Sequence, residues 1–195
     1  MRRSIFILFA CLLALNVYAQ KQDLNTVLKN IFERKSVRSY LVNTTGQSKA
    51  ISKDTLDLIV RAAMAAPSAM NKQPWEFYVI QDTATMRVLA NGLPYAKMLK
   101  MAGAAIVVLG DPSVGKLWQQ DCSAATENML LAIESLGLGA VWTAAFPYEE
   151  RINTVRATLN IPNNLIPLCV VPIGYPKGNT KAKDKWNPEK IHYIK

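Results

Sequence analysis

A short basic segment is the first part of this sequence that could do chemistry. Arg34, Lys35, Ser36 and Arg38 place guanidinium, ammonium and hydroxyl groups within a few residues, just after an amphipathic pattern. A phosphate dianion is best held by charge-assisted donors of this kind. Basic residues at a helix exit also complement the helix dipole and solvate a surface without binding a ligand. Taken alone, the segment is therefore either a phosphate site or an ordinary basic helix end.

A second segment, residues 66–75, carries neutral polar groups in a rigid setting. It reads Ala-Pro-Ser-Ala-Met-Asn-Lys-Gln-Pro-Trp, so the amides of Asn71 and Gln73 stand between two prolines and beside Trp75. Such a turn suits the uncharged polar edge and flat face of a heteroaromatic ring. Pro-Ser and Gln-Pro dipeptides are also common in ordinary loops, and Trp75 would then begin a buried strand. This segment alone does not decide between a binding loop and a structural one.

Other catalytic groups are scarce. His192 is the single histidine, and the cysteine and histidine content falls short of a zinc site. Glu149-Glu150 stands at a helix start, where anions favour the dipole. Gly137-Leu138-Gly139 lies between a predicted helix and a strand, the reverse of the order in a dinucleotide-binding turn, and so predicts a helix stop. The sequence therefore favours a bound cofactor that carries the reaction, and no catalytic side chain is predicted.

Hydrophobic periodicity predicts the elements that position these residues. Leu24, Val27, Leu28, Ile31 and Phe32 recur at helical spacing, and Ser52 caps a second helix that ends before Ala66-Pro67. Further helices are predicted over 116–136 and 148–159, and strands over 75–80, 104–109, 139–144 and 168–173. The residues beyond 173 are rich in proline, glycine and lysine and are predicted to run extended. Helices alternating with buried strands indicate a layered α/β or α+β domain.

Composition limits the class of protein. Hydrophobic residues make up 50% of the chain and charged residues 19%, which is a globular balance with one domain as the default. The formal net charge is +9, yet no zinc-finger spacing, helix-turn-helix or stacked-aromatic platform accompanies it, so we expect an anionic small ligand and no nucleic acid. Cys122 and Cys169 lie in apolar stretches and are predicted to be buried thiols.

The amino terminus predicts export. Arg2 and Arg3 precede an apolar run over 5–15, and Val17-Tyr18-Ala19 fits a cleavage site, so we expect a signal peptide at 1–19 and a mature domain at 20–195. The run is too short for a stable membrane span. The protein would be periplasmic or secreted. A lipoprotein anchor at Cys11 ranks second, and Sec and twin-arginine export both stay open.

Five motifs in this order resemble the nitroreductase family. They are Arg-x-Ser-x-Arg at 34–38, Ala-Pro-Ser-x-x-Asn-x-Gln-Pro-Trp at 66–75, Gly-Leu-Gly-Ala-Val-Trp at 137–142, Pro-Ile-Gly-Tyr-Pro at 172–176 and Lys-Asp-Lys at 183–185. The resemblance runs from about Leu24 to the end of the chain. It implies an α+β fold with a mixed central β-sheet flanked by helices, an intertwined homodimer, and flavin mononucleotide (FMN) as cofactor. The helix over 116–136 would be the interface helix, or a core helix if the chain were a monomer.

The resemblance also implies how the early motifs meet the flavin. Arg34 and Ser36 would bond its phosphate and ribityl chain, with Lys35 contributing mostly backbone. Arg38 would lie near the pyrimidine end, where a cation stabilises the negative charge that reduction brings. Asn71 would bond the pyrimidine edge.

The remaining flavin contacts come from later motifs and from the partner subunit. Pro67 and Ser68 would approach the flavin from the other chain of the dimer. Trp142, Thr143 and Ala144 would run along the ring near N5, which carries the hydride. Lys183 and Lys185 would close on the phosphate, the second with a looser grip than the arginine common in the family.

The implied activity is that of an FMN-dependent oxidoreductase. Hydride would pass in a ping-pong reaction from a donor such as NAD(P)H to a small-molecule electron acceptor, a nitroaromatic or a quinone. An exported protein meets little NAD(P)H, so the predicted signal peptide puts this donor in doubt. Two alternatives stay open: reductive dehalogenation, for which residues 91–103 leave little room for a lid, and a non-catalytic exported flavin-binding or electron-carrier protein.

Overall fold

The computed structural model describes residues 26–44, 46 and 48–194. The chain divides into two compact units, Met1–Arg34 and Lys35–Lys195. In the first unit, residues 26–33 are helical, as the apolar spacing predicts. The predicted signal peptide and Leu24 lie outside the described residues. Within the described ranges, no helix is both long and apolar enough to cross a membrane.

The second unit is built on a central sheet. Its strands are β1 (Trp75–Ile80), β2 (Ala104–Gly110), β5 (Ile166–Gly174) and β3 (Gly139–Ala140) in spatial order, and β4 (Thr143–Ala144) also pairs with β5. These ladders are antiparallel, while Ser36 makes a parallel bridge with Ala140, so the sheet is mixed. Every residue of β2 is buried, which explains its unbroken apolar run. The predicted α+β architecture is confirmed.

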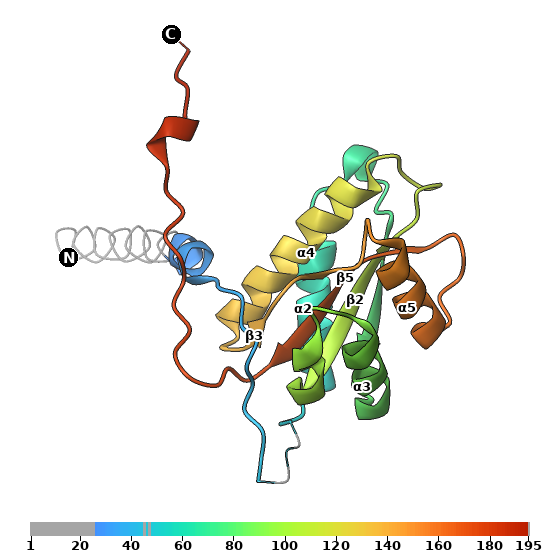
Figure 1. Cartoon of the computed structure of the whole chain (residues 1–195). Helices are drawn as coiled ribbons and strands as arrows, with labels where there is room; N and C mark the ends of the chain where they lie inside the picture. The colour runs from blue at the N-terminus through green and yellow to red at the C-terminus, as the bar shows by residue number, and fades with distance from the viewer. Residues whose placement is uncertain (1–25, 45, 47, 195) are drawn as a thin grey trace, which may run out of the picture. The chain divides into compact units, whose positions relative to one another are not determined.

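Helices cover both faces of the sheet (Figure 1). Alternate residues of β2 point to opposite sides, as strand geometry requires. Ile106 and Val108 pack with α2 (Lys53–Met64) and α4 (Trp118–Ser135), and Val107 and Leu109 pack with α3 (Thr83–Gly92) and α5 (Glu149–Leu159). The two faces therefore hold two separate apolar clusters, and each helix is fixed by its buried stripe.

Capping residues set the helix starts. The Ser52 hydroxyl accepts a hydrogen bond from the Thr55 amide at 3.2 Å, so the predicted start of α2 is confirmed. The Asp82 carboxylate does the same for α3 through the Thr85 amide at 2.7 Å, although the sequence reading does not predict this helix. A short 3₁₀ turn, η2 (Lys97–Met101), follows α3 and leads into β2.

The end of α4 matches the predicted helix stop. Gly137 has a φ of 70°, and its amide donates to the Glu134 carbonyl at 3.0 Å, while the Leu138 amide donates to Ile133 at 3.1 Å. This left-handed turn closes the helix and starts β3 two residues later. The predicted strand over 139–144 is interrupted, because β3 ends at Ala140 and β4 begins at Thr143.

Both cysteines of the second unit are free and buried, as predicted. Burial raises the pKa of the Cys122 thiol to about 12, with a smaller contribution from the neighbouring Asp121 charge. Burial likewise raises the pKa of Cys169 to about 12. Thiols protonated at neutral pH in an apolar setting act as small hydrophobic side chains. They belong to the core.

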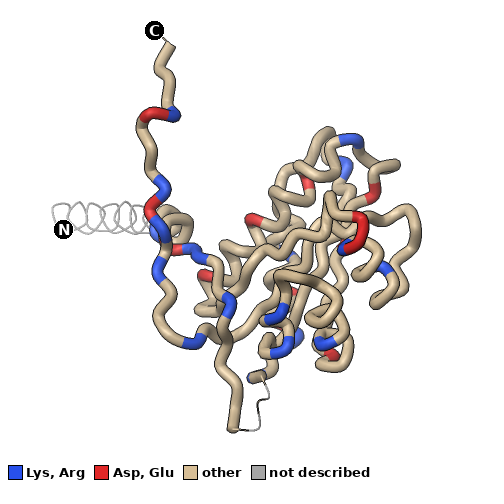
Figure 2. The backbone as a smooth tube through the Cα atoms, in the orientation of Figure 1, with Lys and Arg blue, Asp and Glu red and all other residues tan. Residues whose placement is uncertain are grey.

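The tail after β5 is extended. Residues 177–186 are exposed and form neither helix nor strand, and a single 3₁₀ turn, η3 (Pro188–Lys190), interrupts the rest. Figure 2 shows basic positions recurring along this tail. Its beginning is tied to the second unit, since the Lys177 amide donates to the Ser39 carbonyl at 2.9 Å.

Candidate functional site

A cavity of about 450 Å³ opens in the second unit. Its size is that of a pocket for a small organic ligand or cofactor. The lining residues come from four parts of the chain and are Arg38, Tyr95, Lys97, Met98, Trp142, Thr143, Ala144 and Arg151. Four of these, Arg38 and residues 142–144, are predicted flavin contacts that lie far apart in the sequence. The fold brings them to one place.

Two glycines allow the segment that carries Arg38 to lie close to the sheet. Val37 and Tyr40 are buried, and the Val37 amide donates to the Ala140 carbonyl at 2.8 Å. A Cβ at Gly139 would stand 2.7 Å from Val37, and a Cβ at Gly174 would stand 2.7 Å from Tyr40. With its neighbours fixed in this way, the exposed Arg38 lies at the cavity with a defined backbone position.

Tyr40 strengthens the same anchor. Its hydroxyl lies 3.0 Å from the carbonyl oxygens of both Val37 and Pro172. Burial raises the pKa of Tyr40, and the opposing effect of the Arg38 charge is smaller. The phenol is therefore a neutral hydrogen-bonding group, and it joins the Arg38 segment to β5.

Residues 142–144 form one wall of the cavity. Thr143 directs its hydroxyl away to the Val170 carbonyl of β5, at 2.5 Å, and the β4 pairing holds Ala144 opposite Cys169. Trp142 is half-buried at the cavity. A wall formed by a strand end with small or averted side chains can accept a planar ring along its length.

A cation adjoins this wall and contacts two aromatic rings. The Arg151 guanidinium lies 3.7 Å from the centre of the Tyr148 ring and 5.3 Å from that of Tyr95, and Nη1 donates to the Ala144 carbonyl at 3.3 Å. Its side chain is only 14% exposed. Lys97 is also fixed, because its ammonium donates to the Ala90 and Asn91 carbonyls at 2.9 and 3.2 Å, at the carboxyl end of α3.

The loop before β1 lies apart from the residues that line this cavity. Met70, Asn71 and Gln73 have φ values of 52°, 54° and 48°. These backbone angles lie in the left-handed region, which residues other than glycine rarely adopt. Gln73 Nε2 donates to Asn71 Oδ1 at 2.7 Å, and the Gln73 amide donates to Ser68 Oγ at 3.0 Å. The buried carboxylate of Asp121 on α4 accepts the Ala69 amide at 3.0 Å. The loop is thus a preformed, strained turn with exposed Pro67 and Asn71.

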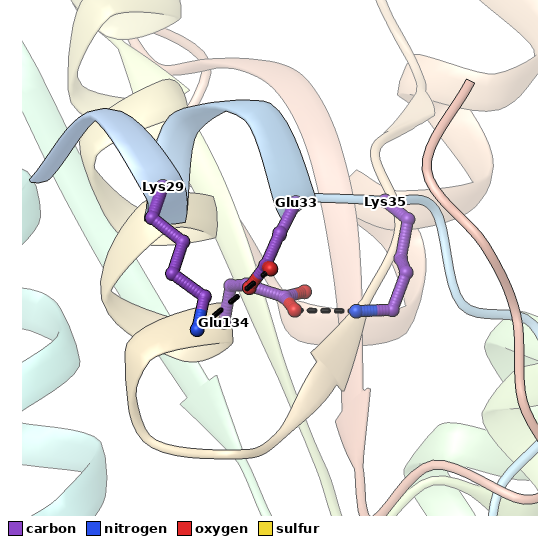
Figure 3. A network of polar contacts seen from close by, with 4 residues as sticks. All are labelled: Lys29, Glu33, Lys35 and Glu134. Atoms are coloured by element: carbon purple, nitrogen blue, oxygen red, sulfur yellow. Dashed lines mark hydrogen bonds and ion pairs between the residues drawn. The ribbon is translucent and has the colours of Figure 1, made fainter. Parts of the chain in front are cut away.

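The remaining predicted phosphate residues do not line the cavity. Lys35 forms an ion pair with Glu134 of α4 at 2.5 Å (Figure 3). Figure 3 also draws the Lys29–Glu33 pair, which lies within the first unit. Arg34 belongs to that first unit. Ser36 is exposed and its backbone bridges to Ala140. Lys183 and Lys185 are exposed in the tail.

These features fit a flavin better than a metal or a hydrolytic centre. Among the described residues, no cluster of histidine, cysteine or carboxylate side chains could hold a metal ion. The cavity lining contains three cations and two aromatic residues, with no carboxylate. Across the described ranges, no hydrogen-bond or ion-pair partner of the Arg38 guanidinium is found, so its donors can serve a ligand. A strand end with a nearby guanidinium suits an electron-poor ring that gains negative charge on reduction.

The sequence reading misses four lining residues, Tyr95, Lys97, Met98 and Arg151. They come from η2, the loop before it and the start of α5, which carry none of the recognisable motifs. Arg151 directly follows Glu149-Glu150, and the sequence reading explains that acidic pair by the helix dipole alone. Only the tertiary packing of α5 beside β4 shows that the arginine turns toward the cavity.

Comparisons with known proteins agree with this geometry. The model of the nitroreductase family matches residues 31–116 and 91–175. A protein of Archaeoglobus fulgidus, provisionally named NADH dehydrogenase/NAD(P)H nitroreductase, is 43% identical over 172 residues, covering 85% of this chain and 95% of the relative. A Bacteroides thetaiotaomicron protein with the same provisional name has a crystal structure that is 51% identical, with a TM-score of 0.82 over 86% of this chain and 96% of that one. A provisionally named nitroreductase from Desulfovibrio desulfuricans, solved in complex with FMN, is 30% identical with a TM-score of 0.73, covering 87% and 96%.

Proposed function

This chain belongs to the nitroreductase family, and from that premise we propose that it is an FMN-dependent oxidoreductase that takes electrons from NAD(P)H and passes them to nitroaromatic or quinone acceptors. One observation carries the proposal. Arg38 and residues 142–144, predicted flavin contacts from distant motifs, line one cavity of about 450 Å³. The cofactor is inferred from this lining and from the relative solved with FMN.

Bound FMN would supply reversible hydride transfer, which gives a ping-pong reaction with donor and acceptor using the same site in turn. The protein supplies position and charge. Arg38 offers a guanidinium whose backbone is fixed by Val37 and Tyr40, so its charge needs little rearrangement to stabilise a developing anion. The strand end at Thr143 and Ala144 would support the ring, with Trp142 beside it in the lining.

We propose that a second copy of the chain contributes residues to this site. Pro67, Ser68 and Asn71 sit on a preformed loop outside the chain's own cavity, and Met70 at the tip is 84% exposed despite being apolar. A strained loop with an exposed apolar tip suits a surface that meets a partner. In the proposed homodimer Pro67 and Ser68 complete the flavin site of the other subunit.

Steady-state kinetics tests the proposed reaction. Initial rates at several NADH and menadione concentrations should give parallel double-reciprocal lines, because the two substrates never occupy the site together. Intersecting lines would exclude the ping-pong scheme. Loss of all turnover in a protein that retains flavin would favour the alternative of a non-catalytic carrier.

We also propose that residues 1–19 are a signal peptide and that the mature domain begins at Gln20. The support is the basic start, apolar run and small residues that precede Gln20. Mass spectrometry of the protein from an envelope or periplasmic fraction should find no residue before Gln20. Intact Met1, or a cytosolic pool alone, would contradict export and would remove the objection to NAD(P)H as physiological donor.

A further inference from the structure

We propose that Arg151 and Lys97 form an anion-binding corner of the cavity and that the enzyme prefers flat acceptors bearing a carboxylate or similar anionic group. This inference rests on the proposed function, since it names the class of acceptor used at the same site. None of the predicted flavin contacts includes Tyr95, Lys97 or Arg151. These residues are therefore available to bind the electron acceptor, which enters the site after the donor has left.

Arg151 is held in place before any ligand arrives. Its guanidinium contacts the faces of Tyr148 and Tyr95, and Nη1 donates to the Ala144 carbonyl. Side-chain entropy is already lost, because only 14% of the side chain is exposed. A guanidinium has five donors, so a bound carboxylate can still be met by those that Ala144 does not use.

The charge of Arg151 is not neutralised nearby. Its closest acidic partner is Glu150, with Nε and Oε1 4.0 Å apart and a glutamate side chain that is 80% exposed. An ion pair at this distance to a solvent-exposed carboxylate contributes little. Arg151 Nε is buried and has no hydrogen-bond partner among the described residues. This nitrogen is closed to solvent, so an incoming acceptor oxygen in this corner would meet the terminal nitrogens of the guanidinium.

Lys97 adds charge at a fixed position. Its ammonium makes two bonds to the α3 carbonyls, which leaves one donor free. A second, smaller hollow adjoins this corner and shares Tyr95, Thr143, Ala144 and Arg151 with the main cavity. The corner therefore offers two fixed cations, an aromatic face at Tyr95 and no lining carboxylate, the arrangement expected for an anionic aromatic ligand.

A matched pair of acceptors tests the corner. 4-Nitrobenzoate and methyl 4-nitrobenzoate differ only in the anionic group, and their kcat/KM ratio measures preference for the carboxylate. Arg151→Met should lower this ratio about tenfold, mainly through KM of the acid, since removal of a buried charge partner costs at least that much. Lys97→Met should lower the ratio by less, because this ammonium is exposed to solvent. Arg151→Lys should retain part of the preference, because the charge stays while the fork geometry is lost.

Two control variants come from the same elements. Arg156 is on α5 and donates Nη2 to the Leu165 carbonyl at 2.9 Å, and Lys100 is on η2; neither lines the cavity. Arg156→Met and Lys100→Met should leave the ratio unchanged. The inference would be overturned by an unchanged ratio in Arg151→Met, or by an equal fall in kcat/KM for both acceptors. It would also be overturned if the variant changed only the preference between NADPH and NADH as donors. Each of these results would leave the proposed function intact.

A binding measurement separates this inference from the activity. Benzoate should quench the tryptophan fluorescence of the purified protein more strongly than methyl benzoate, since Trp142 lines the cavity, and Arg151→Met should remove the difference. If neither nitro compound is reduced but this difference is present, the anion corner stands and the proposed reaction fails. If the difference is absent from the wild-type protein, the corner is wrong.

Discussion

Arg38 joins the sequence motif to the cavity, because it is the residue of the basic segment that the fold places in the lining. We expect Arg38→Ala to weaken FMN binding and to slow flavin reduction together, by about 1.5 to 3 kcal/mol for a charge-assisted contact. Fluorescence titration with FMN gives the first quantity and stopped-flow absorbance the second. Arg38→Lys should recover part of each loss, and Arg87→Ala on α3, outside the lining, should change neither.

A variant Arg38→Ala with full flavin content and a full rate of reduction would show that this guanidinium does not face the cofactor. If FMN binding weakens but the flavin-loaded variant is reduced at the full rate, Arg38 binds the oxidised cofactor and does not stabilise the charge that forms on reduction.

The site could be predicted in part from single residues. Arg38, Thr143 and Ala144 line the cavity, and each belongs to a motif with a recognisable order of residue types. Arg151 and Tyr95 could not be found in this way, since their place depends on how α5 and the segment before η2 pack beside β4. Charge and aromatic character alone do not distinguish them from ordinary surface residues.

At the scale of elements, Gly137 is the best test of local geometry. Its φ of 70° is unfavourable for any residue with a Cβ, although the space around it is open. Gly137→Ala should therefore destabilise the protein by about 1 to 2 kcal/mol. Urea unfolding monitored by circular dichroism measures this directly.

Gly115 is the matched control, because its φ lies outside the left-handed region and a Cβ there would meet Pro74 at an ordinary 3.7 Å. Gly115→Ala should be neutral or slightly stabilising. Equal stability of the two variants would mean that α4 does not end in the left-handed turn described above.

Most elements could be predicted because periodicity and capping agree. The boundaries of β1 match the prediction, and Ser52 caps α2 as expected. The sequence pattern does not predict α3, because its buried stripe of Met86, Leu89 and Ala90 is too short to give a clear helical period. The cap at Asp82 becomes evident only in the structure. The break between β3 and β4 was not predictable either, since residues 139–144 are apolar apart from Thr143 and only their pairing with β5 separates the two strands.

At the scale of the whole molecule, we propose that the basic tail connects cofactor binding to assembly. If Lys183 and Lys185 close on the flavin phosphate of a shared site, flavin binding and dimerisation strengthen each other. Removal of residues 177–195 should lower both, and added salt should weaken flavin binding in the intact chain through screening. Sedimentation of the truncated chain with and without FMN measures the linkage.

The double variant Lys183→Ala/Lys185→Ala is the companion experiment, because it removes charge while keeping the Lys177–Ser39 backbone bond. It should reproduce the loss of flavin affinity. An unchanged dimer that binds FMN tightly in both variants would show that the tail is a solvated surface.

The central claim is that the second unit holds FMN, and the visible spectrum of the natively purified protein tests it most directly. We expect a yellow protein with flavin absorbance that bleaches on reduction by NADH and returns with an added quinone. Denaturation should release a compound that chromatography identifies as FMN. A colourless protein that also fails to take up added FMN would contradict the account.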